Sequence, residues 1–199
     1  MRNVILILSL AILWGCNSSE DTLGTQQSSI VRYLESSHSP RLISEEAARE
    51  SLDDNPEYYT VLGRTAYRYI ATMYENGRDS RTEIGEGDIV EIYFDAYVFN
   101  YASLNNVAPY WSNREETIEA LGRTGGGLDP AYWSTDPLAL KAGQAAIDGI
   151  SRSLVGCREG DRVEVYMTFK AAYGKGIVGL VPKESPVAWL FTIERVTKT

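Results

Sequence analysis

Cysteine and histidine are scarce in this sequence. Its 199 residues include two cysteines, Cys16 and Cys157, and one histidine, His38. Zinc sites draw most of their ligands from these residue types, so no metal site is expected. Cys157 follows the apolar residues Leu154 and Val155 and lies far from His38 in sequence. This context favours a buried, unreactive thiol over a catalytic one.

Positive charge is also in short supply. Lysine and arginine number 19 against 27 aspartate and glutamate residues, which gives a formal net charge of −8 at pH 7. Nucleic acids bind proteins through basic surfaces, so a nucleic-acid partner is not expected. The same charge argues against electrostatic attraction to an anionic membrane surface.

One glycine-rich segment, 174–179, fits the pattern G-x-G-x-x-G and follows an expected strand. A dinucleotide site needs a helix directly after these glycines, because the N-terminus of that helix holds the pyrophosphate. Here the segment runs into Pro182 instead. No dinucleotide or other cofactor is therefore expected.

The N-terminus has the layout of a secretory signal. Arg2 precedes an apolar run at 4–14, which is too short to span a bilayer as a finished helix. The segment 13–16, Leu-Trp-Gly-Cys, resembles the lipobox of bacterial lipoproteins, which implies a signal peptide at 1–15 and lipid on Cys16. The chain is then expected in the cell envelope, facing the periplasm or the outer-membrane surface. An ordinary cleaved signal with a chance cysteine is the alternative.

Residue patterns divide the rest of the chain into parts. Polar residues fill 16–29, which predicts a flexible, lipidated tether. A helical extension is expected at 30–64, where Ser44 is placed to cap a short helix. Residues 65–199 alternate as strands do around one late helix, which indicates an α+β domain with an antiparallel sheet and an irregular insertion at 100–137. Strands are expected at 65–73, 89–99, 162–169 and 188–196, and helices at 115–121 and 145–155.

Five short segments between residues 81 and 196 resemble, in the same order, signature segments of the FKBP family. Each alone is a weak match, and the five together are fairly specific. The resemblance implies an FKBP-like antiparallel sheet wrapped on a central helix. The segments are Gly87-Asp88-x-Val90-x-x-Tyr93, Ala146-Ile147-Asp148-Gly149-Ile150, Ala171-Ala172-Tyr173-Gly174, Leu180-Val181-Pro182-x-x-Ser185 and Val187-Ala188-Trp189-Leu190-Phe191.

The resemblance implies a peptidyl-prolyl cis-trans isomerase. An X–Pro bond exchanges over tens to hundreds of seconds unaided, and a dry aromatic pocket that prefers the twisted amide accelerates this exchange. Catalytic roles are implied for the Tyr173 hydroxyl, the Ile147 N–H and Tyr93. The residues implied to bind the substrate are Trp189, Val181, Ile150, Trp111, Leu140 and Phe99.

Departures from the family leave the function open. The family's Phe-Asp-Ser-Ser segment, whose acid points toward the pocket, has Tyr110-Trp111-Ser112-Asn113 as its nearest counterpart, with Trp111 for Phe and Ser112 for Asp, and Ile150 stands where tryptophan is common. A monomeric isomerase that acts on proline-containing segments of exported proteins is expected. A non-catalytic FKBP-like module that binds peptides or proteins is the alternative, and core packing is the alternative role of each implied site residue.

Overall fold

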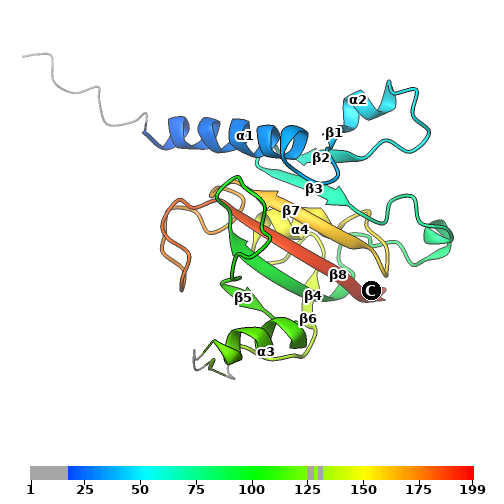
Figure 1. Cartoon of the computed structure of the whole chain (residues 1–199). Helices are drawn as coiled ribbons and strands as arrows, with labels where there is room; N and C mark the ends of the chain where they lie inside the picture. Colours follow the sequence, from blue (N-terminus) through cyan, green and yellow to red (C-terminus); the bar gives the residue numbers. More distant parts are fainter. Residues whose placement is uncertain (1–17, 125–127, 130–131) are drawn as a thin grey trace, which may run out of the picture.

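Strands with alternating apolar residues form one eight-stranded sheet, and Figure 1 shows the helices placed around it. The computed structural model describes residues 18–124, 128–129 and 132–199. In chain order the elements are α1 (Ser18–Ser36), β1 (Ile43–Ser44), α2 (Glu45–Arg49), β2 (Tyr58–Leu62), β3 (Ala66–Ile70), the 3-10 helix η1 (Arg78–Ser80), β4 (Ile89–Val98), β5 (Trp111–Ser112), α3 (Glu115–Arg123), β6 (Leu138–Lys141), α4 (Asp148–Leu154), β7 (Arg162–Met167) and β8 (Val187–Thr197).

Strand order places β8 between β7 and β4. The full order is β1-β2-β3-β7-β8-β4-β5, and β6 pairs with the first half of β4. All neighbours are antiparallel except β1 and β2, so the expected antiparallel α+β sheet is confirmed. The sheet begins earlier in the chain than the sequence predicts. The segment 30–64 was assigned to helices, but it contains β2, which pairs with β3.

The first face of the sheet packs on α4, the central helix. Ile150 of α4 is buried in one apolar cluster with Phe94 of β4 and Phe191 of β8. Gly149 permits this close approach, since an added Cβ would lie 2.5 Å from Sδ of Met167 on β7. The helix is shorter than the 145–155 segment expected from the sequence.

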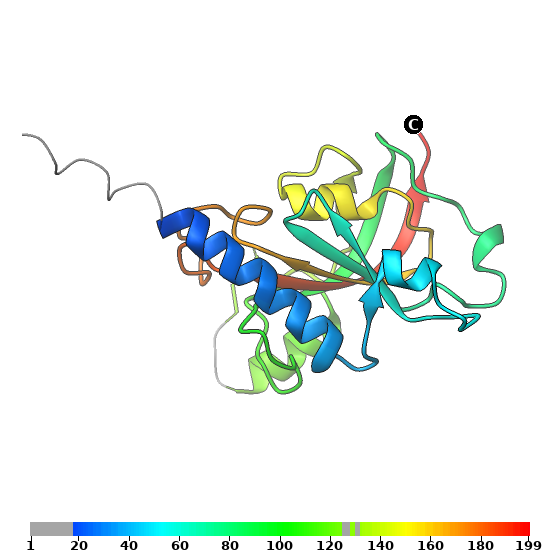
Figure 2. The same ribbon diagram turned by 90° about the horizontal axis from the view of Figure 1, so that it is seen from above.

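The second face packs on α1. Ile30 and Leu34 of α1 are fully buried in a second apolar cluster, together with Tyr166 of β7 and Phe99, which directly follows β4. Figure 2 shows α1 and α4 on opposite sides of the sheet. The sheet is therefore covered on both faces, and each face has its own core.

Polar contacts fix the N-terminal half of α1. The buried Gln26 side chain donates to the Glu184 carbonyl at 2.7 Å and accepts the Phe169 N–H at 2.8 Å. The helix begins at Ser18, so the tether expected to be flexible at 16–29 is helical wherever the structure describes it. Serine, threonine and glycine are weak helix formers, so docking on the sheet stabilises this helix more than its own composition does.

His38 is a buried ion-pair partner beneath α1. Its ring meets Tyr33 and Tyr69 edge-on, with centroids 5.7 and 5.4 Å away. Nε2 lies 2.9 Å from the Glu164 carboxylate, and Nδ1 faces the Pro40 carbonyl. Burial by itself lowers the pKa of His38, but these two acceptors outweigh it and raise the pKa above 6.5. Two acceptors facing both ring nitrogens favour the imidazolium form.

A second buried ion pair joins η1 to the turn before β7. The Asp161 carboxylate is fully buried and accepts from Nε and Nη2 of Arg78 at 2.8 and 2.7 Å. The Thr72 hydroxyl and the Arg158 N–H donate to the same carboxylate at 3.0 and 2.8 Å. This full set of donors compensates the cost of removing the charge from water.

Candidate functional site

Three aromatic rings meet on the α4 face of the sheet. Phe94 and Trp189 stack with their centroids 4.5 Å apart and their planes 12° from parallel. Trp111 meets them edge-on, at 4.7 Å from Phe94 and 5.6 Å from Trp189. Ala96 pairs with Trp189 on one side and with Trp111 on the other, so its small side chain leaves room between the indoles. We call Phe94, Trp111 and Trp189 the aromatic cluster.

Tyr110, from the insertion, covers the indole nitrogen of Trp189 in this cluster. Its hydroxyl accepts the indole N–H of Trp189 at 2.8 Å and shares a hydrogen bond with the Tyr173 hydroxyl at 2.9 Å. Burial, together with the neighbouring Tyr173, raises the pKa of Tyr110 well above its usual value. The hydroxyl therefore stays neutral and occupies two groups that a bound peptide could otherwise use.

Ile147 offers the site one backbone donor. It is the N-cap of α4, with φ −97° and ψ 110°, and its side chain packs half-buried against the first core. Within residues 18–124, 128–129 and 132–199, its N–H makes no hydrogen bond. An unpaired backbone N–H at the edge of an apolar core is suited to a carbonyl of a bound peptide.

Most of the residues that the sequence predicts for the site come together. Trp189, Val181 and Ile150 belong to the same apolar cluster and are each 1% exposed, so a ligand reaches them only if neighbouring side chains move. Tyr173 and Trp111 are half-buried and lie nearer the surface. The predicted residues in this one apolar cluster are Trp189, Val181, Ile150, Trp111, Leu140, Ile147 and Tyr173.

Two predicted residues are not brought to the cluster. Successive side chains of a strand point to opposite faces, so Tyr93 points away from the face of Phe94. It lines a separate hollow of about 340 Å³ with Arg114 and Glu116 instead. Phe99 is buried in the second core beneath α1.

Comparisons with known proteins bear on the fold. No protein-family model and no curated protein matches this chain. The crystal structure of the three FKBP domains of wheat FKBP73 is similar, with a TM-score of 0.52 at 15% identity over 72% of this chain. The chain has an FKBP-like fold. It covers 52% of that wheat structure, about half its length.

Two further FKBP structures, both from Arabidopsis thaliana, are similar to this FKBP-like chain. The N-terminal domain of FKBP42 gives a TM-score of 0.46 at 13% identity, covering 74% of this chain and 96% of that one. A multi-domain immunophilin gives 0.49 at 14% identity, covering 71% of this chain and 46% of that one.

Two residues of the candidate site were missed by the sequence-based prediction. Phe94 follows the predicted Tyr93 directly. Buried and half-buried residues alternate along β4, and applying this alternation to the sequence could have identified Phe94 as the buried one of the two. Tyr110 belongs to the segment 110–113 that the resemblance singles out, but it was given no site role, because its meeting with Tyr173 depends on tertiary contacts.

No acid enters the candidate site from β5. The Ser112 hydroxyl donates to the Phe94 carbonyl at 3.0 Å and to the Asp95 carboxylate at 2.7 Å. Asp95 pairs with Arg114 at 3.2 Å and, as the next residue of β4, points away from the face of Phe94. The site can therefore act through shape, apolar contact and neutral donors, and not through a carboxylate at this position.

The described residues give little support to catalysis by a nucleophilic thiol or by a metal ion. Burial raises the pKa of Cys157 to about 11, so its thiol stays protonated and poorly nucleophilic. Among the described residues, no group of three or more His, Cys, Asp and Glu side chains is placed to hold a metal ion. In the same part of the chain, no helix has both the length and the apolar character needed to cross a membrane.

Proposed function

We propose that this FKBP-like chain binds proline-containing segments of exported proteins and isomerises their prolyl bonds slowly. The aromatic cluster beside Ile147 and Tyr173 supports the proposal. Its rings suit a prolyl ring, and the Ile147 N–H, which no group in the described residues uses, suits the carbonyl that precedes or follows the proline.

The chemistry needs no acid, base or metal. The amide barrier of about 18–20 kcal/mol comes from resonance, which is lost when the bond twists. The twisted amide has less charge separation than the planar one, so a site lined by Trp111, Trp189 and Phe94 favours it. The Ile147 N–H and the Tyr173 hydroxyl hold the flanking backbone so that one side of the bond can rotate against the other.

Tyr110 makes the reaction slow. A peptide that reaches Trp189 or the Tyr173 hydroxyl must first displace the Tyr110 hydroxyl from both. Only the fraction of molecules with Tyr110 displaced can bind, and the apparent affinity falls by that fraction.

A second function is favoured by the same tyrosine. If Tyr110 stays in place, peptides bind only to the outer residues Trp111 and Ile147, and the protein is a non-catalytic FKBP-like binding module. Peptide binding without acceleration of the prolyl exchange is its distinguishing property.

A protease-coupled assay on a short proline peptide tests the proposal. We expect a small acceleration over buffer that is lost in Trp111→Leu. The matched control is Tyr97→Leu, an aromatic-to-leucine change on the other face of β4. Peptide binding with no acceleration at any protein concentration establishes the binding module instead, and loss of activity in both variants contradicts the assigned face.

We also propose that lipid on Cys16 holds the protein in the cell envelope, facing the periplasm or the outer-membrane surface. Support comes from the residue pattern of the N-terminus. Mass spectrometry of the mature N-terminal peptide tests it, with Cys16→Ser as the control. An acyl-modified cysteine as the first residue is expected, and cleavage at another position without acylation refutes the anchor.

A further inference from the structure

The first turns of α1 lie against one particular loop. The loop 174–184 is part of the connection between β7 and β8, and Figure 1 and Figure 2 both show it beside the start of α1. The Ser19 hydroxyl donates to the Glu184 carboxylate at 3.3 Å, and Gln26 donates to the Glu184 carbonyl at 2.7 Å. The N-terminal end of the folded chain and this loop therefore form one end of the molecule.

The tip of this loop presents apolar side chains to solvent. Ile177 is 74% exposed, Leu180 is 76% exposed and Val178 is 45% exposed. Val178 and Val181 exchange two backbone hydrogen bonds of 3.1 and 2.9 Å, which hold the tip as a tight turn. An ordered turn that exposes neighbouring large apolar residues suggests a partner that covers them.

The distance to the proposed anchor limits what that partner can be. Ser18, the first residue of α1, lies two positions after Cys16, and the Cα atoms of two such residues are at most about 7 Å apart. Because α1 is docked on the sheet rather than free, a lipid on Cys16 must bring this end of the molecule against the bilayer.

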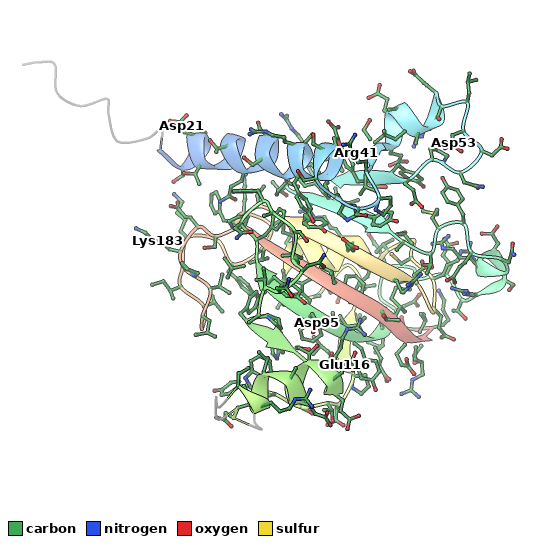
Figure 3. The ribbon with its side chains drawn as sticks, in the orientation of Figure 1. Asp21, Arg41, Asp53, Asp95, Glu116 and Lys183 are labelled. Atoms are coloured by element: carbon green, nitrogen blue, oxygen red, sulfur yellow. The ribbon has the colours of Figure 1, made fainter. Side chains whose placement is uncertain are left out.

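We infer that the tip of the 174–184 loop enters the interfacial region of the phospholipid bilayer and orients the anchored protein. Ile177 and Leu180 supply the apolar contact, while the exposed Lys175 and Lys183 flank them at headgroup level, as lysines do at interfaces. Figure 3 shows Lys183 projecting from the same end of the molecule as Asp21 of α1. Glu184 offsets one lysine charge, so contact depends on apolar burial more than on anionic lipid.

This inference rests on the proposed lipid anchor, so its test reports on the two separately. The full chain is reconstituted in phosphatidylcholine vesicles, with an environment-sensitive fluorophore on Ile177→Cys. Leu52→Cys, whose native side chain is fully exposed, is the matched control. The protein without an added cysteine takes up no fluorophore, because Cys157 is buried and Cys16 is acylated. Flotation of the vesicles with the protein reports on the anchor independently of the label.

The label at position 177 should shift to the blue and be quenched several-fold by nitroxide-labelled phospholipids, while the label at position 52 remains water-like. Flotation together with a water-like label at 177 overturns the loop contact and leaves the anchor standing. A blue-shifted label that nitroxide lipids do not quench assigns the tip to a contact with another copy of this chain and also overturns it. Failure to float refutes the anchor, and the orientation with it.

Discussion

Replacing Tyr110 by alanine should increase prolyl isomerase activity. The Tyr110 hydroxyl makes hydrogen bonds of 2.8 Å with Trp189 and 2.9 Å with Tyr173, and both must break before a peptide can use either residue. A buried hydrogen bond contributes about 0.5–1.5 kcal/mol net, so the pair holds the site closed by about 1–3 kcal/mol. Removing that penalty should raise kcat/KM by roughly 5- to 150-fold, since 1.4 kcal/mol corresponds to about tenfold.

The assay compares kcat/KM for wild type, Tyr110→Phe and Tyr110→Ala on one proline peptide. Phenylalanine removes both hydrogen bonds but keeps the ring, so its activity should fall between the other two. Urea unfolding and near-ultraviolet circular dichroism establish that each variant is folded. A folded Tyr110→Ala variant with kcat/KM no higher than wild type would falsify the closing role of this residue.

Three further predictions concern stability. Arg78→Met leaves the fully buried Asp161 carboxylate without its charge partner. The free energy of unfolding, measured with urea, should therefore fall by about 3–5 kcal/mol. A decrease of less than about 1 kcal/mol contradicts the importance of the pair. Gly149→Ala places a Cβ 2.5 Å from Sδ of Met167 and should cost about 1–3 kcal/mol in the same assay; an unchanged midpoint shows that α4 can shift freely. Because the pKa of His38 is raised in the folded state, its contribution is complete below pH 6.5 and is lost as the pH rises through the folded value. The unfolding free energy of wild type should therefore fall more steeply between pH 6 and 9 than that of His38→Gln, and parallel profiles contradict this.

Several strands could be predicted from the sequence because they are amphipathic or apolar by themselves. The alternation in 89–99 and 188–196 is a local signal, and β4 and β8 lie where it predicts. Tyr58–Leu62 has no such alternation in its burial, since its membership of the sheet depends on pairing with β3.

The N-terminal helix illustrates tertiary control of local structure. The segment 16–29 is rich in serine, threonine and glutamine, and the sequence predicts a flexible tether. Its described part is helical because Gln26 is held by Phe169 and Glu184, which lie more than 140 residues further along the chain. No local pattern encodes such contacts.

The candidate site was predicted in part, and a single position accounts for one failure. Tyr93 and Phe94 are neighbours on β4, so their side chains point to opposite faces of the sheet. The sequence-based prediction chose Tyr93, whereas Phe94 is the residue that faces the site. The motifs placed Ile147, Tyr173 and Trp189, of which Ile147 and Trp189 lie at the end of a helix and on a strand, and Tyr173 lies in the turn after β7. Trp111 was predicted from the neighbouring motif, but the role of Tyr110 was not, since its hydrogen bonds to Trp189 and Tyr173 join segments far apart in the sequence.

Nuclear magnetic resonance can test most directly whether the aromatic cluster receives a prolyl segment. Adding a proline tetrapeptide to 15N-labelled protein should shift the indole N–H signals of Trp111 and Trp189 and the amide signal of Ile147. Signals from Phe99 and Tyr69, in the second core, should stay in place. Shifts confined to the second core or to α1, or none at millimolar peptide, contradict the proposed site.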